Sequence, residues 1–252
     1  MGKLKITLHK FRRKIAHRLH IISEFLYDPR SYKQKRENLS GNIDIELLRE
    51  LTQLGKTIKP ETIIDIGANI GTFVKTAQKV FPEAKKYCFE PNSDITGSIT
   101  TPQTKLYHVA LGNVNEKIRF NISSHHPSSS FLKPILTSDK HPDMLQVASV
   151  EIEVKRLDDV LDEKEINKPL LIKIDVEGYE LEVIKGGGRI ISLAEVVIIE
   201  TSYQSILSGQ PTFKDIHETM LGLGFKYFGN IGKLFPYNGL FLQENSVFRK
   251  IN

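Results

Sequence analysis

The chain has 252 residues, 40% of them hydrophobic and 26% charged, which is the balance of a soluble globular protein and enough length for one decorated α/β domain. Its single cysteine excludes a disulfide framework and suits a reducing compartment. No apolar run reaches the roughly 20 residues of a membrane span, and the N-terminus lacks the features of a secretion signal, so we expect a cytoplasmic protein.

The net charge of +5 comes from the N-terminal arm, because residues 1–22 hold seven lysines or arginines and no acid. The remainder of the chain carries a net −2, which argues against a nucleic-acid surface. Apolar residues recur every three or four positions from Leu4 to Leu26, so we predict a basic amphipathic helix within an arm over residues 1–45. Residues 1–26 could contact an anionic membrane peripherally, or pack on the domain or a partner.

The following residues, 46–252, are expected to form one α/β domain that begins with a helix. Residues 62–66 predict a strand buried on both faces, and helical spacing starts at Thr72. The turn between them contains Gly67 and Gly71, which allow close approach of a ligand. A strand, a glycine turn and a helix form the usual nucleotide-binding unit of an open α/β sheet, although two glycines alone are a weak signal.

The second strand, residues 87–89, ends in Glu90, which follows Asp65 by 25 positions. An acidic residue at this place can accept hydrogen bonds from both hydroxyls of a ribose. The adjacent Pro91 could pack against the base. This combination favours a turn that binds a nucleotide-like ligand over an ordinary strand-to-helix turn.

Further along, residues 92–104 are predicted to contain a helix and residues 106–111 to form a third strand. This strand ends at Ala110 and Leu111, and in such a sheet this edge usually borders the adenine.

An insertion over about residues 117–157 comes next. Its two ends alternate like strands, and between them residues 123–141 are rich in Ser, Pro and His. Loops of this length are often functional. His125 and His126 lie within the loop, where either could act as a general base or simply be solvated.

Carboxylates gather after two later strands. Residues 170–174 predict another buried strand, followed by Asp175 and Glu177, and a further strand over residues 196–199 ends in Glu200. The carboxyl ends of parallel strands meet at one edge, so these side chains should lie near Glu90. Beyond them, a helix over residues 213–223 and two strand-like runs with a short link predict an antiparallel pair at the sheet edge.

Together these segments resemble a known family. The segments IIDIGANIGTF, CFEPN, LLIKIDVEGYELEVIKGG and VVIIE, in this order and spacing, are similar to FkbM-type S-adenosylmethionine-dependent methyltransferases over roughly residues 60–250. SSSFL at residues 128–132 and the late GLF also look similar. The resemblance implies an α/β, Rossmann-like class I methyltransferase with a seven-stranded, mostly parallel sheet, an antiparallel last strand and helices on both faces. It implies O-methylation of a hydroxyl on a sugar, glycan or other hydroxylated metabolite.

The resemblance also implies roles for individual residues. The cofactor S-adenosylmethionine would be bound by Asp65, Gly67, Asn69, Gly71, Glu90, Asn92, Ala110, Leu111 and Asp175, with Glu90 at the ribose and Asp175 beside the sulfonium. An alcohol needs help to become a nucleophile, so a general base is expected. Its candidates are Glu177 first, then Asp175, Glu200 and His126. Carboxylates could hold a divalent metal, but no spacing specifies one, so we predict none.

Three other functions fit parts of the pattern. A nicotinamide-dependent oxidoreductase explains the glycine turn and Glu90 but not the later carboxylates. A methyltransferase acting on RNA or protein is disfavoured by the acidic domain and by the lack of the tetrad typical of amino-methylating enzymes. A binding module tethered by the basic helix would fail to bind the cofactor. The sequence indicates neither the acceptor nor an oligomeric state.

Overall fold

The computed structural model describes residues 43–123, 130–132, 146–205, 207–237 and 240–251. The predicted N-terminal helix, His125 and His126 therefore lie outside the described residues. Among the described helices, none is long and apolar enough to cross a membrane.

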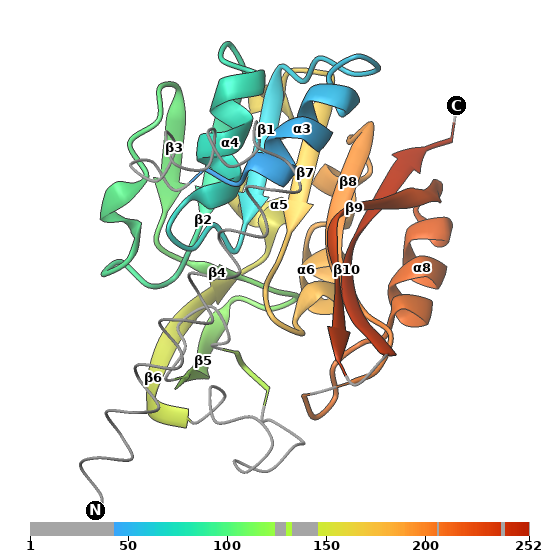
Figure 1. The fold of residues 1–252 in the computed structure, drawn as a ribbon. Coiled ribbons are helices and arrows are strands. Elements are labelled where there is room, and N and C mark those ends of the chain that lie inside the picture. Colours follow the sequence, from blue (N-terminus) through green and yellow to red (C-terminus); the bar gives the residue numbers. More distant parts are fainter. Residues whose placement is uncertain (1–42, 124–129, 133–145, 206, 238–239, 252) are drawn as a thin grey trace, which may run out of the picture.

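The core of the fold is a seven-stranded sheet in the order β3-β2-β1-β7-β8-β10-β9 (Figure 1). Its strands are β1 (Thr62–Ile66), β2 (Lys85–Phe89), β3 (Thr104–Tyr107), β7 (Leu170–Ile174), β8 (Val196–Ser202), β9 (Phe225–Tyr237) and β10 (Leu240–Lys250). The first five are parallel, whereas β10 runs antiparallel to both β8 and β9. The predicted fold class, including the antiparallel pair at the edge, is confirmed.

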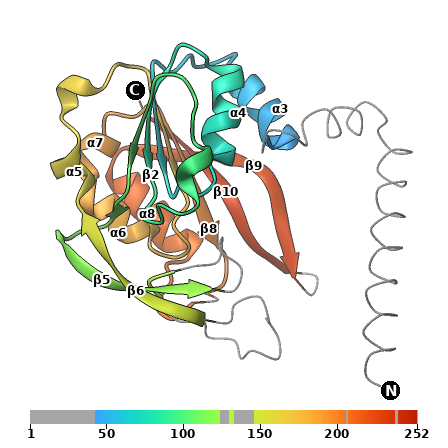
Figure 2. The same ribbon diagram turned by 90° about the vertical axis from the view of Figure 1, so that its left-hand side faces the viewer.

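Helices cover both faces of this sheet (Figure 2). One face carries α3 (Ile45–Leu54) and α4 (Thr72–Val80); the other carries α5 (Leu157–Val160), α6 (Glu180–Gly186), α7 (Gly188–Ile191) and α8 (Phe213–Gly222). Alternate residues of each strand supply the two cores. In β1, Ile63 packs with α3 and α4, and Ile64 packs with the helices of the other face. The central strands therefore have to be apolar on both sides, as their sequences predict.

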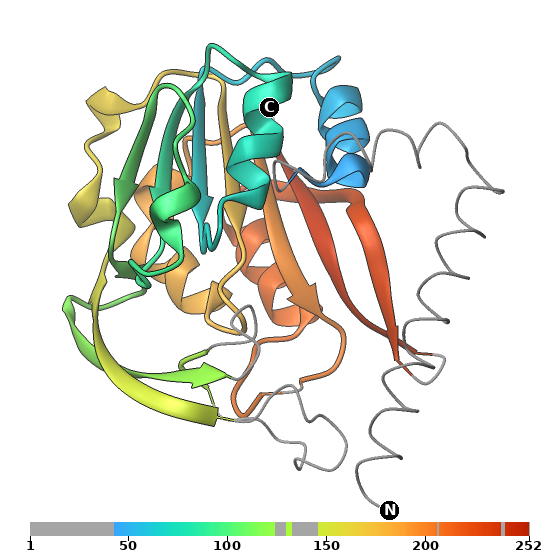
Figure 3. The ribbon, with the colours of Figure 1, turned by 60° about the vertical axis from the view of Figure 1, so that its left-hand side comes forward.

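A smaller sheet, β4-β6-β5, lies below the carboxyl ends of the large one (Figure 3). It comprises β4 (Ala110–Leu111), β5 (Glu116–Ser123) and β6 (Gln146–Lys155). β4 and β6 pair in parallel at only two positions, and Gly112 N donates to Lys155 O at 3.0 Å. The two ends of the insertion are thus neighbours where the chain leaves and re-enters the domain.

Three local predictions are wrong in part. The run at residues 106–111 is not one strand, because β3 ends at Tyr107 and the chain then crosses to the small sheet as β4. Residues 92–104 hold only a short 3-10 helix, Thr96–Ser98, rather than a full helix. Asn, Ser, Gly and Pro in this stretch favour turns over helical backbone. Strand β9 is also longer than the predicted run from residue 226 to 229.

Candidate active site

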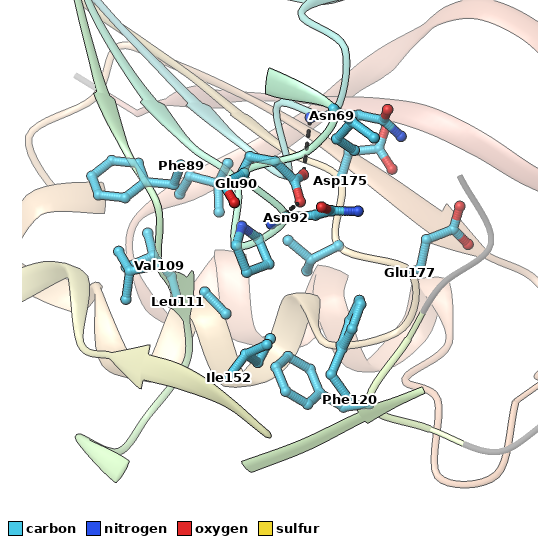
Figure 4. Close-up of a pocket in the computed structure, with 18 of the residues that line it drawn as sticks. Asn69, Phe89, Glu90, Asn92, Val109, Leu111, Phe120, Ile152, Asp175 and Glu177 are labelled. Carbon is cyan, nitrogen blue, oxygen red and sulfur yellow. Dashed lines mark hydrogen bonds between the residues drawn. The ribbon is translucent and has the colours of Figure 1, made fainter. Parts of the chain in front are cut away.

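A cavity of about 470 Å³ opens between the carboxyl edge of the large sheet and the small sheet (Figure 4). Its strand-end wall is formed by residues at or just after the large-sheet strands: Gly67, Asn69, Glu90, Asn92, Asp175, Glu177 and Glu200. Its insertion wall is formed by Phe120, Phe131, Val150 and Ile152. Apolar side chains of Phe89, Val109 and Leu111 lie between the two walls. The cavity therefore joins a polar, acidic side to an apolar one.

The turn after β1 brings bare backbone to the cavity. Gly67 has a φ of 82°, and a Cβ there would lie 1.8 Å from the Asp175 carbonyl oxygen. Asn69, with a φ of 48°, is also left-handed, and its Oδ1 accepts a hydrogen bond from Ile70 N at 2.7 Å. Gly71, with a φ of 82°, starts α4. Only glycine fits the first of these positions, since a side chain would separate β1 from β7.

Glu90 fixes the loop that follows β2. Its Oε2 accepts from Asn69 N at 3.0 Å and its Oε1 from Asn92 N at 2.9 Å, so the carboxylate joins two loops. The residue is 9% exposed, and burial raises its pKa, which the two backbone donors partly oppose. Figure 4 places Glu90 beside Asn69 and Asn92 at the cavity.

Three carboxylates, Asp175, Glu177 and Glu200, form what we call the acidic cluster. They offer oxygens that all lie within 4.8 Å of one another. Burial first, and the neighbouring carboxylates second, raise the pKa of Glu177 and of Glu200. The Lys173 ammonium lies 2.9 Å from Asp175 Oδ2 and supplies a positive charge to the cluster. Oxygens at this spacing suit a divalent cation. Because Lys173 already supplies a positive charge to the cluster, the carboxylates alone give no reason to place a metal ion there.

Asp65 lies behind the cavity rather than on its surface. It is 2% exposed, and among the described residues its Oδ2 has no hydrogen-bond partner. Burial raises its pKa to about 7, an effect that the positive charge of Lys173 opposes. The two residues point to the same face of the sheet, on adjacent strands. Asp65 is therefore placed to influence the charge of the site from beneath.

The turn from Asp175 to Glu180 is held at several points. Asp175 N donates to Ile66 O at 2.9 Å, which ties the turn to β1. Glu180 Oε1 accepts from Val176 N at 3.2 Å and Gly178 N at 2.9 Å; its pKa is raised to about 7, mainly by burial. Glu177 itself has a φ of 51°. A left-handed non-glycine residue is unfavourable unless its surroundings fix it, and such residues gather at functional sites.

The structure brings most of the predicted site residues to one cavity. Lining residues include Gly67, Asn69, Glu90, Asn92, Ala110, Leu111, Asp175, Glu177 and Glu200. Asp65 and Gly71 stand behind the lining, and His126 lies outside the described residues. Their individual roles stay predictions.

The sequence reasoning missed two residues that contact this site. Lys173 is 5% exposed, and a lysine inside the otherwise apolar run LLIKI was a signal that it has a buried partner. Ser130 Oγ donates to Glu177 O at 2.6 Å, and nothing local in the sequence indicates that contact.

Comparison with known proteins identifies the family of the chain. The Hexuronic acid methyltransferase AglP of Haloferax volcanii is 31% identical over 141 residues, which cover 56% of this chain and 55% of that protein. The 2-O-methyltransferase NoeI of Sinorhizobium fredii is 27% identical over 165 residues, which cover 60% of this chain and 68% of that protein. The chain thus spans little more than half the length of the first relative.

A solved TehB-like SAM-dependent methyltransferase from Corynebacterium glutamicum aligns with 90% of this chain and 99% of its own, at 12% identity and a TM-score of 0.45, too distant to inform the site. The family profile described as the Methyltransferase FkbM domain matches residues 65–227, which is more than half of the chain. It spans the glycine turn, Glu90 and the acidic cluster. The chain therefore belongs to the FkbM methyltransferase family, as its sequence motifs predict.

Proposed function

We propose that the protein methylates a hydroxyl group of a sugar or glycan, with S-adenosylmethionine as the donor. The observation that most supports this is the placement of Glu90 and the acidic cluster around one cavity at the carboxyl edge of the sheet. One carboxylate is suited to bind a nucleoside, and the others are suited to orient a cationic group and take up a proton. An oxidoreductase would leave the acidic cluster without a role.

The residues present fit the donor. Each oxygen of Glu90 accepts one backbone N–H and keeps further lone pairs for ribose hydroxyls. Val109 and Leu111 offer an apolar surface for the adenine, and the backbone at Gly67 leaves room for the methionine part. Asp175 would lie beside the sulfonium. When bound, the donor supplies a methyl group made electrophilic by that sulfonium.

Glu177 is our first choice for the group that accepts the hydroxyl proton. Burial and its acidic neighbours raise its pKa, which makes the ionised carboxylate a stronger base. The positive charge of Lys173 lowers the pKa of Glu177 and so favours its ionised form. Asp175 and Glu200 are the alternatives from the same cluster, and His126 is the alternative from the insertion.

The acceptor class follows from the relatives and from the insertion wall. Two relatives are named for methylation of a hexuronic acid and for 2-O-methylation. In this chain, the aromatic side chains of Phe120 and Phe131 line the same cavity as the carboxylates. Sugars present both apolar ring faces and hydroxyls, so such a pair of surfaces suits them.

The test combines binding and turnover on matched variants. We expect the wild type to methylate members of a panel of glycosides, detected by mass spectrometry. Glu177→Gln should lower kcat by about 10²–10⁴-fold while leaving the affinity for S-adenosylmethionine within a few-fold. Glu182→Gln is the control, since that carboxylate pairs with Lys185 and does not line the cavity.

Other outcomes separate the alternatives. Full activity of Glu177→Gln would mean that Glu177 is not the base and that another member of the acidic cluster takes up the proton. Calorimetric binding of NADH in place of S-adenosylmethionine would favour the oxidoreductase. Methylation of RNA or protein but no glycoside would overturn the acceptor class.

We also propose that the domain begins near residue 46 and that residues 1–26 attach it peripherally to the cytoplasmic face of a membrane. The support is the basic amphipathic pattern of the arm. The full chain should sediment with vesicles containing anionic lipid, and a chain without residues 1–26 should not. Equal binding of both forms would refute the attachment.

A further inference from the structure

The insertion is anchored on the acidic cluster through a short segment, Ser130 to Leu132. Ser130 is 2% exposed, although it belongs to a long connection between two strands. Its Oγ donates to Glu177 O at 2.6 Å and accepts from Leu132 N at 3.0 Å. The single O–H donor of this buried side chain is thus committed to Glu177 O, so the contact ties the peptide of Glu177 to the insertion.

The two residues after Ser130 pack against the two residues that follow Glu177 in the turn. Leu132 Cδ1 lies 3.0 Å from the place where a Cβ of Gly178 would be. The ring of Phe131 lies 4.5 Å from the ring of Tyr179, centroid to centroid. Phe131 also meets Phe120 of β5 edge to face, at 5.1 Å. A three-residue segment thus packs along three consecutive residues of the turn and continues into the insertion wall.

The two carboxylates of this turn are therefore held by different parts of the molecule. Asp175 is fixed from β1, through its amide and through the close approach of Gly67. Glu177, two residues later, has left-handed backbone and receives its hydrogen bond from the insertion. Removing that bond would leave an unfavourable backbone conformation with one restraint fewer.

We propose that Ser130 is a positioning residue, whose hydroxyl holds the Glu177 peptide so that the Glu177 carboxylate faces an acceptor bound against the insertion wall. This rests on the proposed function in one respect, namely the role of Glu177 as the base. It makes the insertion part of the catalytic geometry as well as a wall of the cavity. A sugar that shifts the insertion wall would shift the base with it.

The test uses a matched pair of serines. Ser192 Oγ donates to Gly188 O at the same 2.6 Å but lies in a helix end away from the cavity. Ser130→Ala should lower kcat by roughly 10–100-fold, the range expected when a reacting group is displaced by about 1 Å, with donor affinity unchanged. Ser192→Ala should leave both unchanged. Ser130→Cys keeps the side-chain size with a weak donor and should behave like Ser130→Ala, which separates the hydrogen bond from packing.

Two further measurements make the test decisive. In a Glu177→Gln background, Ser130→Ala should have no additional effect on kcat, because the two changes act through one group. Hydrogen exchange of the amides from Val176 to Glu180 should become about 10-fold faster in Ser130→Ala and stay unchanged in Ser192→Ala.

An equal loss of kcat in both backgrounds, or unchanged exchange of the turn, would overturn the proposal. The exchange experiment needs no acceptor. If no glycoside is methylated by the wild type, the proposed function fails, and exchange alone decides whether Ser130 holds the turn.

Discussion

The strand-end wall and the insertion wall of the cavity are built in different ways. In the strand-end wall, backbone contacts join the strand ends: Gly67 and Ala68 amides both donate to Phe89 O at 3.0 Å, and the turn after β7 touches the turn after β1. The buried Glu90 carboxylate joins two of its loops. In the insertion wall, side chains make the attachments, through Ser130 and the rings of Phe120 and Phe131. On the proposed function, we expect the donor to bind at a wall that tolerates little change and the acceptor to bind at a wall that can vary at lower cost.

The largest effect is expected where the strand-end wall is tightest. Gly67→Ala should destabilise the protein by about 3 kcal/mol or more, because its Cβ would overlap the Asp175 carbonyl at a left-handed position. Gly209→Ala has nearly the same φ, 81°, with no atom within 4 Å, so it should cost only about 1 kcal/mol. Chemical denaturation measures both. Equal losses would mean that the strand-end wall can relax.

The turn between the two walls should give stability a pH dependence. The pKa of Glu180 is about 7 in the folded protein against 4.5 in the unfolded chain, so its contribution is complete below pH 4.5 and is lost as pH rises through 7. Glu180→Gln keeps an acceptor oxygen but cannot ionise, so this loss, on the order of 3 kcal/mol, should disappear from the pH profile of unfolding. Glu182→Gln, in the same helix, should keep the wild-type profile. An unaltered profile for Glu180→Gln would contradict the assignment.

Donor binding should depend on the strand-end wall and the apolar residues beside it, and not on the insertion wall. Glu90→Ala removes two charge-assisted hydrogen bonds and the proposed ribose contact, so affinity for S-adenosylmethionine should fall about 30–100-fold, or 2–3 kcal/mol. Glu195→Ala removes a comparable bond, to Leu170 N, at the opposite edge of the sheet and should leave affinity unchanged. Calorimetric titration measures both. Equal weakening by the two variants would show that the loss is structural.

The smallest effect is expected on the insertion wall. Phe120→Ala should raise the KM for the acceptor about fivefold, equivalent to roughly 1 kcal/mol, with unchanged donor affinity. Phe228→Ala, an exposed ring on β9, is the control and should change neither. If Phe120→Ala weakened donor binding more than acceptor binding, the division of the cavity into two functional walls would be wrong.

The difference between the walls also explains what the sequence could reveal. The buried parallel strands β1 and β7 were predictable because short, mostly apolar runs between turn residues have few alternatives, and the residues after them then had to meet at one edge. Glu90 and the acidic cluster follow from that rule alone. The break between β3 and β4 was not predictable, because an apolar run does not indicate which of two sheets will bind each part of it.

Contacts across the fold were beyond reach of the sequence for a different reason. Lys173 and Asp175 are only two positions apart in the sequence. The effect of the Lys173 charge on Asp65, however, depends on the register between β1 and β7. The bond from Ser130 to Glu177 joins positions 47 residues apart. Nothing in the sequence around Ser130 indicates that its hydroxyl contacts the Glu177 carbonyl.

The narrow stem of the insertion has a consequence for how acceptor choice could change. Residues 112–155 begin and end at the two-residue pairing of β4 with β6, so their two ends are already neighbours whatever lies between. The entropy of closing such a loop grows only slowly with its length. On the proposed function, we expect that this segment can be exchanged between related enzymes with its acceptor preference, provided that the new segment keeps the contact that Ser130–Leu132 make with the turn after β7.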